Sequence, residues 1–149
     1  MRVSIRMNSF LLAGAVLSAM AALVHVAIVV GGPSWYRFFG AGEKFAHAAE
    51  QGKLFPALVT LGIALVLLSW SFLAISASGA LPTFPFLKIA LCLITGIYLL
   101  RGIAGFVLLI TPAFLKQKLT STFLVVSSLI CLGYGVVHLV GLVQVWDRI

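Results

Sequence analysis

Acidic residues are scarce in this sequence, which has three Asp and Glu against ten Lys and Arg in 149 residues. Charged residues of both signs make up 9% of the chain, whereas an ordinary soluble domain has about 25%. This deficit excludes a soluble catalytic fold. The basic residues are scattered singly between apolar runs instead of forming one patch, which argues against nucleic-acid binding and for roles in membrane orientation and head-group contact.

Cysteine is also rare, and the two thiols, Cys92 and Cys131, both fall inside apolar runs. They form no disulfide framework, zinc-ligand spacing or Cys-x-x-Cys motif, so each is expected to act as a small apolar side chain. The sequence contains no recognisable cofactor motif, and we predict no cofactor.

Apolar residues, by contrast, make up 62% of the chain. They form four runs, each close to the ~20 residues that a helix needs to cross the hydrocarbon core. Strands of a membrane barrel would be about half as long and would alternate in polarity. We therefore predict an all-α polytopic membrane protein in which residues 1–149 form one domain. It is an antiparallel four-helix bundle with spans at about 10–30, 54–75, 86–110 and 123–146.

The connection over residues 31–53 is the only one long enough to carry structure of its own. It opens with a Gly-Gly-Pro sequence that ends the first span. Four aromatic residues between positions 35 and 39 follow, which is typical of head-group depth. Residues 41–51 then predict a short interfacial helix. Glu43, His47 and Glu50 recur on it at i, i+4 and i+7, so their side chains share one face.

Four spans place both termini on one side of the membrane. The basic residues divide almost evenly between the two sides: Arg2, Arg6, Lys88 and Arg148 on the terminal side, against Arg37, Lys44, Lys53, Lys116 and Lys118 on the other. The first span often sets the orientation, and its leading end is basic. We predict a multi-pass protein of a bacterial inner membrane with cytoplasmic termini, while the near balance leaves insertion in both orientations open.

Three ionisable residues, His25, Arg101 and His138, fall inside the predicted spans. Each costs at least ~2.5 kcal/mol near the centre of a membrane helix, so each calls for a partner or a function. His25 and Arg101 lie at a similar depth, about 22 Å from the starts of two parallel spans. Tyr98 precedes Arg101 by one turn on the same face.

These positions predict a ligand site in which His25, Tyr98 and Arg101 lie beneath the surface helix with its Glu43, His47 and Glu50. The site would hold the anionic head of an amphipathic or lipid-like ligand, because a guanidinium binds phosphate or carboxylate bidentately. The alternative for Arg101 is structural, either as an ion pair with a carboxylate of the surface helix or by snorkelling to the head groups.

Two further kinds of site have weaker support. Glu43, His47 and Glu50 are suitable ligands for zinc or iron, but their spacing is equally typical of a solvated helix face, and we predict no metal. A bis-histidine haem requires ligands at one depth, whereas His25 and His138 differ by roughly 14 Å. We expect His138 to be a neutral ring bonded to a neighbouring helix.

The segment from His25 to Glu43 resembles small, uncharacterised four-helix inner-membrane proteins of bacteria. This resemblance covers most of the chain in layout but only this segment in motif. The chain is also similar in size to the small multidrug exporters, yet its first span lacks the carboxylate that is essential in that family. Neither resemblance implies an activity.

The leading hypothesis is a non-catalytic protein that binds an amphipathic ligand or serves as an accessory subunit for a membrane-protein partner. A small transporter or channel is the first alternative, with protomers joined through small-residue faces such as Gly14, Ser18 and Ala22. A membrane-embedded enzyme acting on lipids at the interfacial helix is the second, although no convincing nucleophile accompanies its acid and base groups.

Overall fold

The computed structural model describes residues 7–111 and 121–149, and every regular element in those ranges is a helix. Four helices are long and apolar enough to cross a membrane: α1 (Ser9–Gly31), α4 (Phe55–Ala77), α5 (Leu87–Leu109) and α7 (Ser121–Val145). At 1.5 Å per residue each is about 35 Å long, which spans the hydrocarbon core. The protein is a multi-pass integral membrane protein, and the predicted all-α, four-span fold is confirmed.

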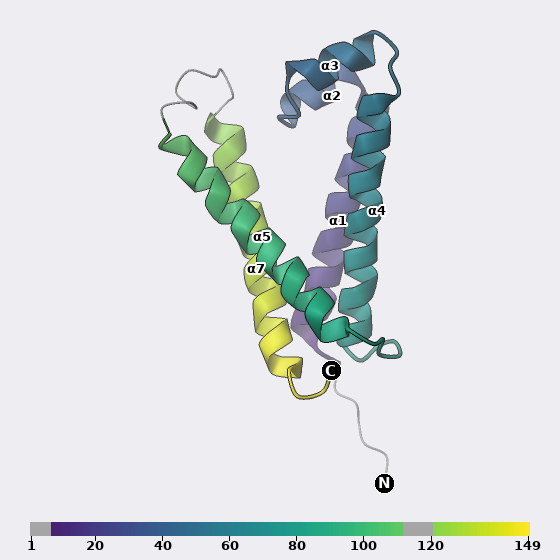
Figure 1. Cartoon of the computed structure of the whole chain (residues 1–149), viewed down its shortest axis with the longest axis vertical. Helices are drawn as coiled ribbons and strands as arrows, with labels where there is room; N and C mark the ends of the chain where they lie inside the picture. Colours follow the sequence, from purple (N-terminus) through teal and green to yellow (C-terminus); the bar gives the residue numbers. More distant parts are fainter. Residues whose placement is uncertain (1–6, 112–120) are drawn as a thin grey trace.

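The connection after α1 differs from the prediction, because it holds two short helices instead of one. These are α2 (Pro33–Phe38) and α3 (Glu43–Glu50). The proline that was expected only to end a span also begins α2, since its fixed φ suits the first position of a helix. Gly40 and Gly42 have positive φ values and separate α2 from α3. Both helices lie across the ends of α1 and α4 (Figure 1), and we call them the cap.

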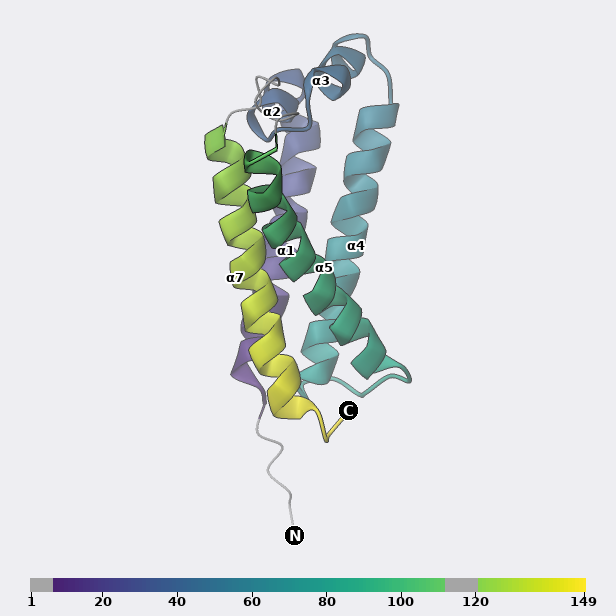
Figure 2. The same ribbon diagram turned by 60° about the vertical axis from the view of Figure 1, so that its left-hand side comes forward.

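The four spans form two hairpins that make a V (Figure 1). In the first hairpin α1 packs along α4, and in the second α5 packs along α7. The hairpins meet at the end that carries the C-terminus and diverge towards the cap. Figure 2 shows α5 starting beside the end of α4 and rising towards the start of α7. The bundle is therefore tightly packed at one end only.

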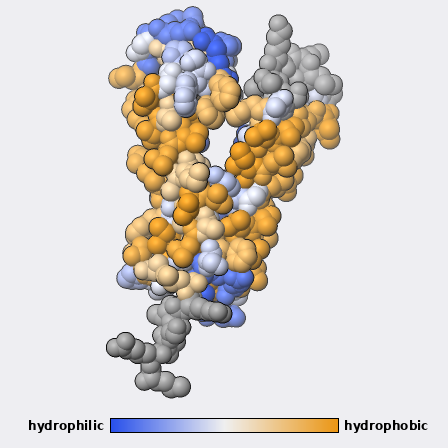
Figure 3. Space-filling view, turned by 180° about the vertical axis from the view of Figure 1, so that it is seen from behind, coloured by the Kyte–Doolittle hydropathy of each residue, from blue (hydrophilic) through white to orange (hydrophobic). Residues whose placement is uncertain are grey.

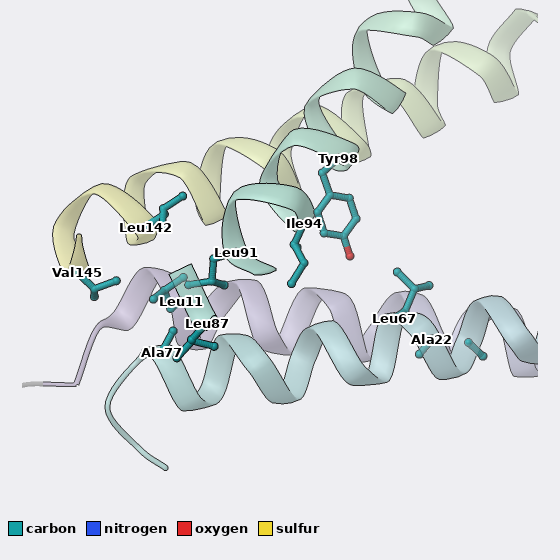
Figure 4. Close-up of a cluster of buried hydrophobic side chains, with 11 residues drawn as sticks. Leu11, Ala22, Leu67, Ala77, Leu87, Leu91, Ile94, Tyr98, Leu142 and Val145 are labelled. Atoms are coloured by element: carbon teal, nitrogen blue, oxygen red, sulfur yellow. The ribbon is translucent and has the colours of Figure 1, made fainter. Parts of the chain in front are cut away.

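The core lies at the closed end, where side chains from all four spans interlock (Figure 4). Leu11, Leu91 and Val145 are completely buried there. Tyr98 is the residue of α5 furthest towards the cap in this cluster, and Leu67 and Ala22 lie beyond the point where the second hairpin leaves the first. Most other large apolar side chains point outwards, as expected of helices that face lipid.

Asn8 fastens three elements together at the closed end. Its Oδ1 accepts a hydrogen bond from the backbone N–H of Leu11 at 2.9 Å, which caps α1. Its Nδ2 donates to Gln144 Oε1 of α7 at 2.8 Å, and its backbone N–H donates to the Ser78 carbonyl after α4. The starts and ends of these helices are thus joined by polar contacts that the apolar pattern of the sequence does not reveal.

Small residues allow the hairpins to come close. A Cβ at Gly14 of α1 would lie 2.8 Å from the His138 ring of α7, and one at Gly141 of α7 would lie 2.7 Å from Leu11. The small-residue faces that the transporter hypothesis assigns to contacts between protomers therefore pack inside the chain.

Towards the cap, the space-filling view shows an opening between the two hairpins (Figure 3). Its walls are largely apolar. Beyond the opening, the Phe123 ring of α7 contacts Gly40, which follows α2, so closely that a Cβ at Gly40 would collide with the ring. We call this feature the inter-hairpin opening.

Candidate ligand site between the hairpins

A buried polar junction closes the inner end of the inter-hairpin opening. Ser18 Oγ of α1 and the Tyr98 hydroxyl of α5 form a hydrogen bond of 2.9 Å across the hairpins. The Tyr98 ring contacts Trp70 of α4 and Tyr134 of α7, with centroids 5.2 and 5.5 Å apart. Tyr98, predicted as a ligand-site residue, is only 6% exposed and belongs to this junction.

His138 also belongs to the junction and is fully buried. Its Nδ1 donates a hydrogen bond to the Tyr134 carbonyl of its own helix at 2.9 Å, so the expected bond to a neighbouring helix is not what the structure contains. Its Nε2 has no partner among the described residues. Because the ring lies against Gly14, eleven residues before His25, the two span histidines are about 16 Å apart along α1. They cannot meet at one iron.

Arg101 lies on α5, one turn beyond Tyr98 towards the cap. It follows Tyr98 by three residues, which puts both side chains on one face of α5. The guanidinium extends one turn towards the cap, and its Nη1 is 3.4 Å from the position that a Cβ would occupy at Gly105. The Ser128 side chain of α7 borders the same space. The Cys131 thiol of α7 is close enough to the Arg101 guanidinium for an electrostatic interaction.

A side chain at position 105 would collide with Ser128, whereas the Arg101 guanidinium would be at an ordinary contact distance from its Cβ. Arg101 is exposed. It forms no hydrogen bond or ion pair with any residue in the ranges 7–111 and 121–149. The alternative in which Arg101 pairs with Glu43 or Glu50 is not what the structure contains, because both carboxylates bind another arginine.

That arginine is Arg37 of α2, which joins the cap into one unit. Its Nε donates to Glu43 at 3.1 Å and its Nη2 donates to Glu50 at 2.8 Å. Glu50 also accepts from His47 Nδ1 at 3.3 Å, while Gln51 donates to His47 Nε2 at 3.0 Å. The Arg37 guanidinium, followed by His47, lowers the pKa of Glu50, and the two carboxylates raise the pKa of Arg37.

Of the three residues predicted on one face of the surface helix, Glu43 and Glu50 therefore bind Arg37 in place of Arg101, and His47 contacts Glu50. No three His, Cys, Asp or Glu side chains among the described residues gather closely enough to hold a metal ion. The cap also has an apolar recess of about 430 Å³ beside Trp35 and Phe38 of α2 and Phe39, the residue after it. Aromatic side chains in such a place are typical of head-group depth.

His25 lies on α1, beyond Ser18 towards the cap. It follows Ser18 by seven residues, two helical turns, and so shares the face of Ser18. Its Nδ1 is 2.8 Å from the Ala21 carbonyl oxygen. A carbonyl can only accept, so Nδ1 carries the hydrogen and the Nε2 of a neutral ring is left with a lone pair.

The Ser18–Tyr98 hydrogen bond provides a common reference point from which distances along α1 and α5 can be compared. His25 is seven residues from Ser18, and Gly105, over which the guanidinium lies, is seven residues from Tyr98. Both groups are therefore about 10 Å from the junction along their helices. The similar membrane depth of His25 and Arg101 stays a prediction, and no hydrogen bond joins the two residues within the described part of the chain.

Sequence reasoning missed two contributors to this arrangement. Arg37 was counted only as a charge for orientation, although its spacing of six and thirteen residues from Glu43 and Glu50 across two glycines could have suggested a bridge. Ser128 carried no signal, because its place beside Gly105 depends on how α5 crosses α7. Four of the basic residues counted for membrane orientation, Arg2, Arg6, Lys116 and Lys118, lie outside the described residues.

No family model, curated protein or solved structure matches this chain. The site is therefore interpreted from its own geometry.

Proposed function

We propose that this protein is a non-catalytic membrane protein that binds an amphipathic ligand through an anionic head group in the inter-hairpin opening. The observation that carries the proposal is Arg101, a permanent cation at membrane depth without a counterion among the described residues. The chain would reside in a bacterial inner membrane with cytoplasmic termini, so that the cap faces the opposite side.

No acidic side chain of the protein is available to form an ion pair with Arg101. It contains three acidic residues in total, and Glu43 and Glu50 are bound to Arg37 in the cap. The third, Asp147, follows α7 at the closed end of the molecule. Arg101 itself precedes the end of α5 by eight residues, about 12 Å. A cation at such a depth requires compensation, and an anion from outside the chain supplies it.

The shape of the opening favours an amphipathic anion. A guanidinium binds phosphate and carboxylate groups bidentately, and the apolar walls around it suit a hydrocarbon tail. A carboxylate from a membrane-protein partner would satisfy the same charge, and that is the accessory-subunit form of the hypothesis. The two forms are separated by what remains bound after purification.

The test is to purify the protein in mild detergent and identify bound molecules by mass spectrometry. Arg101→Met should reduce the retained anionic lipid at least tenfold, since charge-assisted hydrogen bonds are lost, and Arg101→Lys should retain part of it. Lys88→Met is the matched control, because it removes one positive charge at the other end of α5, where Lys88 lies over the Trp146 ring. Equal retention by Arg101→Met and Lys88→Met would refute the proposal.

A further inference from the structure

We infer that His25 selects the ligand by its head group, accepting a hydrogen bond from a hydroxyl or ammonium group next to a phosphate held by Arg101. The ligand would then be a membrane phospholipid with a hydrogen-bond donor in its head group. This inference rests on the proposed function and adds to it the class of lipid.

The chemistry of His25 is fixed by its neighbour. The Nδ1–H group donates a hydrogen bond to the Ala21 carbonyl oxygen. A neutral ring therefore offers the ligand only the lone pair of Nε2. His25 therefore accepts a hydrogen bond, whereas Arg101 can only donate.

The two groups complement each other at one level. Both are about 10 Å from the Ser18–Tyr98 junction along their helices, and their register with Ser18 and Tyr98 puts them on the faces of α1 and α5 that meet at this junction. A phosphodiester with a small alcohol or amine beyond it presents an anion and a donor a few bonds apart. Such a head group matches the donor on α5 and the acceptor on α1 together.

The position of the opening favours the bilayer over water as the source. It is closed on one side by the Ser18–Tyr98 hydrogen bond and by Gly14 packed against His138. On the other side Phe123 contacts Gly40. A lipid therefore enters sideways, between the hairpins, from the leaflet on the cap side, and its tail stays among apolar side chains.

The experiment compares two lipids that carry the same charge and acyl chains. Phosphatidylglycerol has hydroxyl donors in its head group, and phosphatidylmethanol has none. The full-length protein is placed in phosphatidylcholine nanodiscs with equal small amounts of both, and retention is measured by native mass spectrometry. We expect phosphatidylglycerol to be preferred by roughly fivefold, the size of one hydrogen bond. His25→Phe should abolish the preference and keep Arg101-dependent retention of both lipids.

Leu23→Phe is the control, because Leu23 is 66% exposed on the same helix, and it should keep the preference. Equal retention of the two lipids by the unaltered protein would overturn the inference while leaving the proposed function intact, and that comparison does not depend on any variant folding. A preference that persists in His25→Phe would also overturn it. Retention of neither lipid would refute the proposed function itself. Displacement of phosphatidylglycerol by equimolar inorganic phosphate would refute the bilayer as the source.

Discussion

The contact between Gly14 and His138 offers the sharpest test of how the hairpins are joined. A Cβ at position 14 would lie 2.8 Å from Cε1 of the His138 ring and 3.0 Å from both ring nitrogens. Carbon atoms prefer separations of about 3.5–4.0 Å, so Gly14→Ala requires a shift. The ring resists it, because Nδ1 is bonded to the Tyr134 carbonyl and one face is against Tyr98.

We expect Gly14→Ala to cost about 1–3 kcal/mol through overpacking. The measured loss of stability is smaller than this cost, because replacing glycine by alanine inside a helix itself stabilises the helix by about 0.5–1 kcal/mol. Gly62→Ala in α4 carries the same gain with nothing within 4 Å of the new Cβ. The difference between the two variants therefore isolates the contact at about 1–3 kcal/mol.

The free energy of unfolding can be measured by circular dichroism in mixed micelles titrated with sodium dodecyl sulfate. His138→Ala provides a second arm, because Gly14→Ala should cost much less when the ring is absent, with a coupling of about 0.5–3 kcal/mol. If Gly14→Ala and Gly62→Ala have the same free energy of unfolding within about 0.3 kcal/mol, the hairpins do not pack through Gly14. The packing described for the closed end of the bundle would then be wrong.

Three other features give direct predictions. The pKa of Glu50 lies below its ordinary value of 4.5, so its contribution to the cap is complete above that pH and is lost as pH falls through the lowered pKa. Amide hydrogen exchange in α3, relative to its intrinsic rate, should therefore quicken as the pH falls below 4.5, and Arg37→Gln should remove this dependence. Gly40→Ala should loosen the contact between the cap and Phe123, whereas Gly52→Ala should leave this contact unchanged. Both glycines have φ near +70°, but only Gly40 lies against a ring. The accessibility of cysteines introduced into the cap would measure the difference between the two variants. Asn8→Ala should destabilise the protein by about 1 kcal/mol or more, since it removes the α1 cap and the bond to Gln144, and an unchanged unfolding midpoint would contradict that role.

The spans and their order were accessible from the sequence because they depend on local physics. A continuous apolar run must bond its own backbone inside lipid, and only a helix does so within one segment. The ends of the four spans were accordingly placed within a few residues. The cap was placed less well, because Pro33 both ends α1 and starts α2, and one sequence signal supports either outcome.

The sequence also predicted in part which residues share a helix face. Spacing alone therefore identified some residues of the candidate site. His25 and Arg101 were assigned a similar depth by helical rise, and the register through Ser18 and Tyr98 agrees. The binding role of these residues stays a prediction. Spacing could not tell which carboxylates Arg101 would reach, because that depends on where the cap lies relative to α5.

The sequence by itself determined a membrane protein of four apolar helices with too few acidic residues to neutralise its own cations. Only the tertiary structure decided that the helices pair as two hairpins, which are joined at one end through Gly14 and His138 and diverge towards the cap. It also decided that Arg37 takes both cap carboxylates and leaves Arg101 over Gly105. The physical reason is that helix formation is set by neighbours along the chain, whereas the partner of a charged side chain is set by how the helices pack against one another.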